Sequence, residues 1–251
     1  MEQIKENILG YKVNIFSIDE CVNGIFQSLR DGNRTWLACF NPHSYTVALD
    51  DKVFSRALKD ADWLVPDGSG IVLASRFLGG KIRKRVTGSD VFAGLSRRMN
   101  EDGSMRVFFL GATRETLKLI QQNMAVDYPD IKVADVYSPP FKDVFSNADI
   151  SKMIKAVNSS APDVLWVGMS APKQEKFILE NRSRLNVKFV AAVGAVFDFY
   201  SGNVSRAADS WFVNHGMEWL PRLLQEPKRL WKRMVVSAPV FITHVVRQRL
   251  K

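Results

Sequence analysis

The sequence predicts an α/β protein, with a Rossmann-like, mostly parallel sheet flanked by helices and a small basic helical appendage at the C-terminus. Three observations predict it. Short apolar runs without polar alternation recur along the chain, as is typical of strands buried on both faces. Segments with helical spacing of apolar residues lie between these runs. Positive charge is concentrated in the last 30 of the 251 residues.

Seven runs rich in β-branched and aromatic residues are the candidate strands. Most of them hold four to six apolar residues in succession. Because helical segments separate the runs, right-handed crossovers would make neighbouring strands parallel. The candidate strands are Tyr11–Ile18, Thr35–Phe40, Trp63–Val65, Val107–Leu110, Val133–Tyr137, Val164–Val167 and Phe189–Val193.

The segments between the runs carry helical patterns. Thr113–Asp127 places Leu117, Ile120 and Met124 at helical spacing. Another segment begins with Pro172, a preferred first helical residue, after Ser170 as a candidate cap. The expected helices are Ile71–Leu78, Thr113–Asp127, Asp149–Asn158 and Pro172–Arg184.

The chain is predicted to have a larger Rossmann-like domain, residues 1–205, and a basic helical appendage, residues 206–251, where positive charge is concentrated. From Arg222 onward there are eight basic residues and one acid, which gives that stretch +7 of the net +9. Pro227 predicts two helices there instead of one. The basic residues are mixed with Leu, Trp, Val and Phe, which favours an anionic lipid surface over nucleic acid. A solvated basic tail is the alternative.

The rest of the composition indicates a protein of the cytoplasm. The two cysteines, Cys21 and Cys39, have neither metal-site spacing nor a disulfide framework, which is typical of a reducing compartment. The N-terminus carries acids before any apolar run, unlike a signal peptide. Apolar stretches fall short of the roughly 18 residues of a spanning helix. We therefore expect a cytoplasmic protein that does not cross the membrane.

Turn-forming and polar residues follow five of the candidate strands. Ligands of open parallel sheets bind beyond the carboxyl ends of the strands. Glycines there allow close approach to the backbone, and helix N-termini present free N–H groups to anions. This edge is therefore expected to bind a phosphate or a nucleotide. The segments are Asn41–Ser44, Pro66–Gly70, Gly111–Thr113, Gly168–Glu175 and Gly194–Asp198.

Asp67 is the strongest single candidate for chemistry. It follows a short apolar strand and precedes Gly68-x-Gly70, which turns the chain into a helix. A carboxylate at that place can serve as the general base that removes a proton from an attacking hydroxyl. The alternative is an Asp that only forms a turn or caps a helix.

Other motifs are weaker. The run Gly68–Ala74 is a loose dinucleotide fingerprint, so an NAD-dependent oxidoreductase remains an alternative function. Asp90 has the spacing of a ribose-binding acid, but its context indicates a turn and helix cap. Asp60 and Asp62 form a DxD motif before a strand and not after one, which indicates solvated residues at a helix end.

Histidines and a run of basic residues are the remaining candidates for a binding site. The three histidines are far apart in sequence and indicate no metal site; they are His43, His215 and His244. The basic run Lys81–Gly88 could lend one arginine to a diphosphate leaving group. A non-catalytic basic module that binds RNA or a membrane is the third class of function left open.

Eight segments together, in this order and spacing, resemble the WecG/TagA/CpsF family of glycosyltransferases. They cover about residues 10–235. The segments are Asn41-Pro42, Pro66-Asp67-Gly68-x-Gly70, Arg85-Val86-Thr87-Gly88-x-Asp90, Phe109-Leu110-Gly111, Pro162-Asp163-x-Leu165-x-Val167-Gly168, Pro172-Lys173-Gln174-Glu175, Val193-Gly194-Ala195-x-Phe197-Asp198 and Glu218-Trp219-x-x-Arg222-Leu223-x-x-Glu226-Pro227-x-Arg229.

The resemblance implies an inverting transferase that needs neither metal nor cofactor. Its donor would be UDP-N-acetylmannosamine or a related UDP-hexose. Its acceptor would be a saccharide on undecaprenyl diphosphate, for a cell-surface polysaccharide. The protein would then sit peripherally on the inner face of the cell membrane, contact it through the appendage and bind no nucleic acid. Self-association into a homo-oligomer stays open.

The resemblance also assigns residues. The catalytic base of the family falls on Asp67. Cys39 stands where some relatives carry Thr, which replaces a hydroxyl by a thiol. The substrate-binding residues implied by the matching segments are Cys39, Asn41, Arg85, Gly111, Gly168, Lys173, Gln174, Gly194, Asp198, Arg222 and Arg229, with Lys232 or Arg233 as a third basic residue of the appendage.

Overall fold

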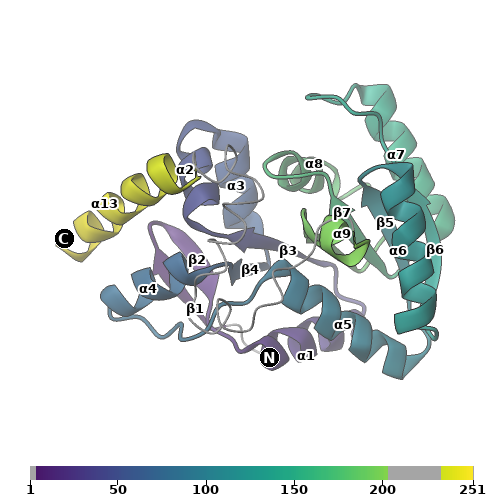
Figure 1. Ribbon diagram of the computed structural model, residues 1–251, viewed down its shortest axis with the longest axis horizontal. Helices are drawn as coiled ribbons and strands as arrows, with labels where there is room; N and C mark the ends of the chain where they lie inside the picture. The colour runs from purple at the N-terminus through teal and green to yellow at the C-terminus, as the bar shows by residue number, and fades with distance from the viewer. Residues whose placement is uncertain (1–3, 203–232, 251) are drawn as a thin grey trace.

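The computed structural model describes residues 4–202 and 233–250, and this part of the chain forms an α/β fold around a six-stranded parallel sheet (Figure 1). The strand order is β4-β3-β8-β7-β5-β6, and each neighbouring pair is parallel. This confirms the predicted Rossmann-like class. The strands are β3 (Thr35–Phe40), β4 (Trp63–Pro66), β5 (Arg106–Gly111), β6 (Lys132–Tyr137), β7 (Val164–Gly168) and β8 (Phe189–Ala192).

Helices cover both faces of this sheet (Figure 1). Apolar side chains of α1 (Ile18–Arg30), α5 (Gly88–Asp102), α6 (Arg114–Asp127) and α9 (Val196–Tyr200) pack on one face. The other face is covered by α2 (Pro42–Asp50), α3 (Lys52–Asp60), α4 (Ser69–Phe77), α7 (Asn147–Ser160), α8 (Lys173–Asn181) and α13 (Ala238–Arg249), which follows the short π-helix η1 (Arg233–Ser237).

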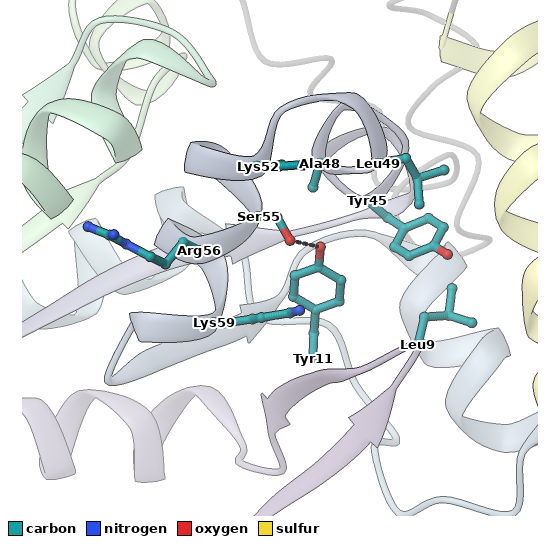
Figure 2. Close-up of a pocket in the computed structure, with 9 residues that line it drawn as sticks. All are labelled: Leu9, Tyr11, Tyr45, Ala48, Leu49, Lys52, Ser55, Arg56 and Lys59. Atoms are coloured by element: carbon teal, nitrogen blue, oxygen red, sulfur yellow. Dashed lines mark hydrogen bonds between the residues drawn. The ribbon is translucent and has the colours of Figure 1, made fainter.

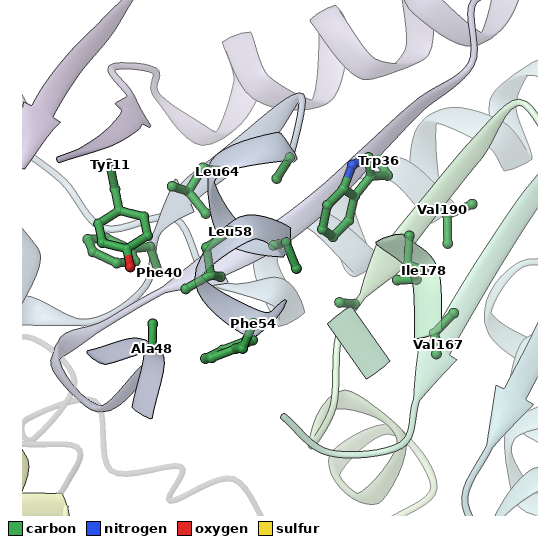
Figure 3. Close-up of a cluster of buried hydrophobic side chains, with 14 of the residues drawn as sticks. Tyr11, Trp36, Phe40, Ala48, Phe54, Leu58, Leu64, Val167, Ile178 and Val190 are labelled. Atoms are coloured by element: carbon green, nitrogen blue, oxygen red, sulfur yellow. The ribbon is translucent and has the colours of Figure 1, made fainter. Parts of the chain in front are cut away.

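The strands are apolar throughout because they bury side chains on both faces. In β5, Phe108 and Leu110 join the core under α7 and α8, whereas Val107 and Phe109 join the core under α5 and α6. Figure 3 shows the first of these cores, where Trp36 of β3 lies beside helical side chains. Each large side chain buried this way stabilises the fold by roughly 1.5–3 kcal/mol.

The expected strand Tyr11–Ile18 is wrong in extent and in partner. The strand β2 ends at Asn14 and pairs antiparallel with β1 (Lys5–Ile8), in a hairpin separate from the main sheet. The chain then enters α1, which Ser17 caps through a reciprocal pair of hydrogen bonds with Glu20. This capping box ends the extended backbone before Ile18.

The expected helices are present, with different starts. Thr113 caps α6 at the expected place, and α4 begins at Ser69, two residues before the expected start. The start of α8 was wrong in detail. Its first helical residue is Lys173, with Pro172 at the N-cap position. Ser170 has a left-handed backbone (φ 62°) and is not the cap.

The structure also tests the predictions for three acidic residues that stand next to helices in the sequence. Asp90 is the third residue of α5 and bonds reciprocally with the N-cap Thr87, as the motif predicts. Asp60 ends α3 and pairs with Arg182 at 3.1 Å. Asp62, expected to be solvated, is half-buried, accepts the Trp36 N–H at 2.9 Å, and has a pKa raised by burial.

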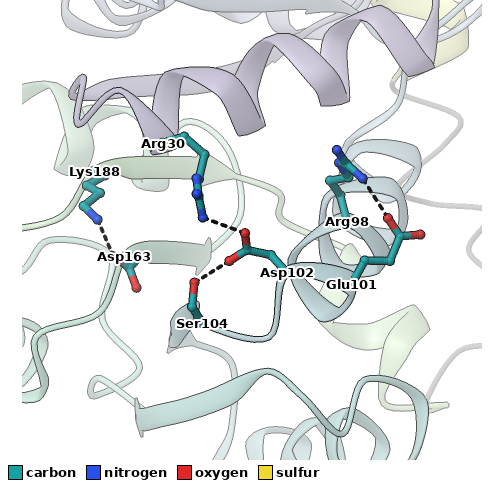
Figure 4. Close-up of polar contacts among 7 residues, drawn as sticks. All are labelled: Arg30, Arg98, Glu101, Asp102, Ser104, Asp163 and Lys188. Atoms are coloured by element: carbon teal, nitrogen blue, oxygen red, sulfur yellow. Dashed lines mark hydrogen bonds and ion pairs between the residues drawn. The ribbon is translucent and has the colours of Figure 1, made fainter.

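An acid aligns the amino ends of the central strands. Asp163 precedes β7, accepts the Arg106 N–H of β5 at 2.9 Å, and pairs with Lys188 before β8 at 2.7 Å. Figure 4 shows this pair beside a second group in which Asp102 contacts Arg30 and Ser104. With the amino ends in register, the carboxyl ends of these strands form a common edge.

Helix α13, near the described end of the chain, packs on α2 and α4. Phe241 and Val245 of α13 are buried against α2 and α4. The phenol of Tyr45 and the Nδ1 of His244 lie 2.6 Å apart, and His43 Nδ1 lies 3.0 Å from Ser237 Oγ. Both histidines thus join helices, as expected of structural residues. Among the helices of residues 4–202 and 233–250, none has the length and hydropathy that crossing a bilayer requires.

Candidate active site

The carboxyl ends of β3 and β4 bring Asp67 and Asn41 together. Asp67 directly follows β4, and its N–H donates to the carbonyl of Phe40 at 2.8 Å. The side-chain amide of Asn41 donates to Asp67 Oδ2 at 3.1 Å, while its oxygen caps α2 by accepting from the Ser44 N–H at 2.9 Å. Gly68 then takes a positive φ of 92°, which allows the sharp entry into α4. The carboxylate of Asp67 is therefore held at the strand edge by a neighbour from the adjacent strand.

Arg85 and Cys39 lie beside this pair. The N–H of Val86 donates to the carbonyl of Pro66 at 2.9 Å, so the half-buried Arg85 runs along the end of β4. A Cβ on Gly88 would lie 3.3 Å from the Cys39 sulfur, which places the start of α5 against that thiol. Burial raises the pKa of Cys39 well above its ordinary value, and the carboxyl groups of Asp67 and Glu175 raise it further. The thiol is thus neutral.

Gly111 ends β5 and Gly168 ends β7, and between these two neighbouring strands the order in which the chain adds strands to the sheet reverses. From β5 the chain proceeds to β6 on one side, and from β7 it proceeds to β8 on the other. Ligands of such sheets bind at this switch point. A Cβ on Gly111 would lie 2.3 Å from the Gly168 carbonyl oxygen, and one on Gly168 would lie 2.6 Å from the Phe197 ring. Both positions therefore require glycine.

Gln174 joins the loops that follow β7 and β8. Its side-chain oxygen accepts the Met169 N–H at 3.3 Å and the Gly194 N–H at 3.1 Å. Its Nε2 donates to Glu175 Oε1 at 2.9 Å. The predicted residues Gln174 and Gly194 are therefore in direct contact.

Glu175 is a residue whose importance the sequence did not reveal. It belongs to the segment Pro172-Lys173-Gln174-Glu175 that resembles the family, but it is not among the predicted site residues. Its side chain is buried, and burial raises its pKa to about 7. Oε2 has no hydrogen-bond partner among the described residues. Its hydrogen bond with Gln174, which in turn accepts from the Gly194 N–H, places it at the sheet edge where β7 and β8 end.

Several helices begin at this edge, so the backbone itself favours anions there. The N-caps of α2, α4, α5 and α8 are each a predicted site residue or lie within two positions of one in the sequence; they are Asn41, Gly68, Thr87 and Pro172. Gly68 and Pro172 provide no side-chain hydrogen bond to the first turns of α4 and α8. Uncapped N–H groups and the helix dipoles suit the binding of a diphosphate.

Two predicted residues lie at the margin of this group. Lys173 donates to the carbonyl of Lys142, and its Nζ lies 5.3 Å from the centroid of the Phe145 ring, so it engages the loop after β6. Asp198 is exposed on α9. Arg222, Arg229 and Lys232 lie outside the described residues, as does the side chain of Arg233.

A cavity of about 450 Å³ lies elsewhere, between β2, α2 and α3 (Figure 2). Tyr11, Ser55 and Lys59 line it, and the Tyr11 hydroxyl lies 2.9 Å from Ser55 Oγ. The predicted site residues are not part of its lining. The described residues also contain no group of three or more His, Cys, Asp or Glu side chains placed to hold a metal ion.

The fold and the candidate site define an α/β protein with a glycine-rich sheet edge and one carboxylate that a hydrogen bond holds there. Residues 6–251 match the glycosyl transferase WecG/TagA/CpsF family, and the chain belongs to this family. It is therefore a glycosyltransferase, and the NAD-dependent alternative is not favoured.

The chain is similar to several bacterial proteins named N-acetylglucosaminyldiphosphoundecaprenol N-acetyl-β-D-mannosaminyltransferase. The chain is 32% identical to the Bacillus subtilis (strain 168) protein over 212 residues, which cover 84% of this chain and 79% of that protein. It is 32% identical to the Bacillus spizizenii (strain W23) protein, over 82% and 77% of the two chains. The Staphylococcus aureus (strain MW2) protein is 24% identical over 98% of this chain and 94% of its own.

Proposed function

We propose that this enzyme transfers N-acetylmannosamine from UDP-N-acetylmannosamine to N-acetylglucosaminyl-diphosphoundecaprenol, with Asp67 as the base. The observation that carries the proposal is the placement of Asp67 by Asn41 at the edge where the strands end. The names of the relatives support the acceptor and the sugar.

In the proposed reaction Asp67 takes the proton of the acceptor hydroxyl. The hydroxyl oxygen forms a bond to the anomeric carbon from the side opposite UDP. The bond between that carbon and the diphosphate oxygen breaks, its electron pair leaves with UDP, and the configuration at the sugar inverts. A positioned base of this kind typically contributes 10²- to 10⁴-fold to a rate.

The leaving diphosphate needs positive charge, and the sheet edge offers it. We place the diphosphate near Gly111 and Gly168, where the strand order switches and glycines allow close approach. Arg85 and the uncapped starts of α4 and α8 would offset its charge. The arginines of the appendage would complete this set. The role of a metal in other transferases would thereby fall to protein groups.

A lipid-linked acceptor implies that the enzyme contacts a bilayer. The described residues include a surface suited to such contact. Helix α13 packs on α4, and both expose large apolar side chains. Phe77 is 50% exposed and Ile242 is 58% exposed. Arg76, Arg247 and Arg249 on the same two helices suit anionic headgroups. We propose that these helices rest on the inner face of the cell membrane.

Release of UDP tests the function. Full-length protein in detergent is given a panel of UDP-sugars, with and without the N-acetylglucosaminyl-diphospho-lipid, and each reaction is run with and without EDTA. Acceptor-dependent UDP release from UDP-N-acetylmannosamine is expected. Release from a different sugar alone would overturn the proposed donor, and release only without EDTA would overturn the metal-independent mechanism.

A further inference from the structure

Glu175 is a buried acid, and only one of its two carboxyl oxygens has a hydrogen-bond partner among the described residues. Its side chain is 2% exposed, Oε1 accepts from Gln174 Nε2 at 2.9 Å, and Oε2 has no partner among the described residues. A buried carboxylate of this kind is costly, and a residue with only a packing role would be better replaced by an apolar one. Its presence beside the strand edge calls for a role in the site.

That role is to fix the orientation of the Gln174 amide. The side-chain oxygen of Gln174 already accepts two backbone N–H groups, from Met169 and Gly194. The amide nitrogen must then find an acceptor, and Glu175 Oε1 supplies it. With the amide reversed, its NH₂ group would face the two N–H donors and the link between the loops after β7 and β8 would break.

We propose that Glu175 is a positioning residue of the transferase, and that its protonated carboxyl orients Gln174 to hold the two donor-binding loops together. This inference rests on the function proposed above. A neutral acid keeps the hydrogen bond at Oε1 and adds no charge to an edge that already holds Asp67 and must bind a diphosphate.

The charged groups around α8 are consistent with a neutral Glu175. Lys176 pairs with Asp51 of α3 at 2.9 Å, and Arg182 pairs with Asp60 at 3.1 Å, so these cations of α8 are directed at α3. Within β7 and β8, against which α8 lies, the sequence has no titratable side chain. The titratable and charged groups at the strand edge are the neutral Cys39 thiol, the Asp67 carboxyl group and the Arg85 guanidinium. Burial is the main cause that raises the Glu175 pKa to about 7.

The consequence is a loss of activity on the alkaline side. As the pH rises through about 7, Glu175 ionises and places a negative charge beside the diphosphate. Donor binding should weaken, so the KM for the UDP-sugar should rise more than kcat falls. With an inactive ionised form, kcat/KM falls about tenfold per pH unit above that value.

The test compares kcat/KM for the UDP-sugar between pH 5.5 and 9, using full-length wild type, Glu175→Gln and a matched control. Glu175→Gln keeps a neutral acceptor for Gln174 and cannot ionise. The control is Glu180→Gln, at an exposed position of the same helix. We expect the alkaline decline in wild type and control, and a profile flat to beyond pH 8 in Glu175→Gln, with activity at pH 6 within about threefold of wild type.

A wild-type profile of kcat/KM without the alkaline decline would overturn the proposal. This outcome does not depend on whether the Glu175→Gln variant folds. An unchanged decline in folded Glu175→Gln would overturn it equally. A wild type that transfers no sugar would instead contradict the proposed function. In that case carbon-13 NMR of the glutamate carboxyl groups decides: a resonance titrating near pH 7 supports the neutral Glu175, and titration of all of them near 4.5 overturns it.

Discussion

The side-chain amide of Asn41 donates a hydrogen bond to the Asp67 carboxylate across 3.1 Å and ties the end of β3 to the end of β4. The same Asn41 accepts from the Ser44 N–H and so starts α2. One side chain thus fixes the path of a helix and the orientation of the candidate base. These two roles can be separated by substitution.

Asn41→Ser should keep the helix and weaken catalysis. Serine is a good N-cap residue, but its hydroxyl is too short to reach Asp67 in place of the amide. We expect kcat to fall about tenfold or more, because the base loses its orientation. Asn41→Ala should lose the cap as well, which lowers the free energy of unfolding by about 1 kcal/mol. Wild-type kcat in Asn41→Ser would show that the contact does not orient the base.

Asp67→Asn should remove the base and leave the fold intact. The amide is isosteric with the carboxylate but accepts no proton at neutral pH. We expect kcat to fall by roughly 10²- to 10⁴-fold, as for loss of a general base, with an unchanged melting temperature. Asp143→Asn, at an exposed position of the loop before α7, is the control. Full turnover by Asp67→Asn in an acceptor-dependent UDP-release assay would remove Asp67 from the mechanism.

The sequence predicted the sheet edge well because buried parallel strands have a distinct pattern. Continuous apolar runs located the six strands, and parallel strands necessarily end at one edge, so Asn41, Asp67 and Gly194 were expected to gather there. The prediction for Tyr11–Ile18 was wrong because apolar residues alone specify neither the partner of a strand nor its end. Ser17 and Glu20 form the capping box that could have shown where that strand must end.

The role of Glu175 could not be read from the sequence. The buried face of a helix is normally recognised in a sequence by its apolar residues. Gln174 and Glu175 are both polar, yet both are buried because the start of α8 lies among the loops that follow β7 and β8. Their burial depends on tertiary structure, so the hydrophobic pattern of the sequence does not reveal it.

Gly111→Ala should destabilise the protein far more than Gly103→Ala. The added Cβ at position 111 would lie 2.3 Å from the Gly168 carbonyl oxygen, a backbone atom that cannot move without disturbing β7. Gly103 has a positive φ of 70° but open space around it, so alanine there meets only backbone strain. We expect urea unfolding to show a loss of roughly 2–4 kcal/mol for Gly111→Ala and about 1 kcal/mol for Gly103→Ala. Equal losses would mean that the contact with Gly168 is relaxed elsewhere.

Glu175 should also make stability depend on pH. Its folded-state pKa of about 7 lies above the ordinary 4.5, so the folded protein binds an extra proton between these values. Stability from this group is present at low pH and is lost as the pH rises toward 7 and beyond. Between pH 5 and pH 8 the free energy of unfolding should fall by roughly 2–3 kcal/mol more in wild type than in Glu175→Gln, which cannot ionise at this position. Identical pH dependence of the unfolding free energy in both proteins would contradict the raised pKa.

The exposed apolar side chains of α4 and α13 should govern binding to membranes. Inserting Phe77 and Ile242 into the headgroup region removes apolar surface from water, and the nearby arginines add attraction to anionic lipid. The double variant Phe77→Ser, Ile242→Ser should bind vesicles of phosphatidylglycerol and phosphatidylcholine about tenfold more weakly in sedimentation assays. Val126→Ser removes a 79% exposed apolar side chain from α6 and should bind as wild type does. Turnover on a water-soluble acceptor should be unchanged in the double variant, because the sheet edge is untouched. Loss of turnover on that acceptor, or equal weakening by Val126→Ser, would contradict a membrane-contacting role confined to α4 and α13.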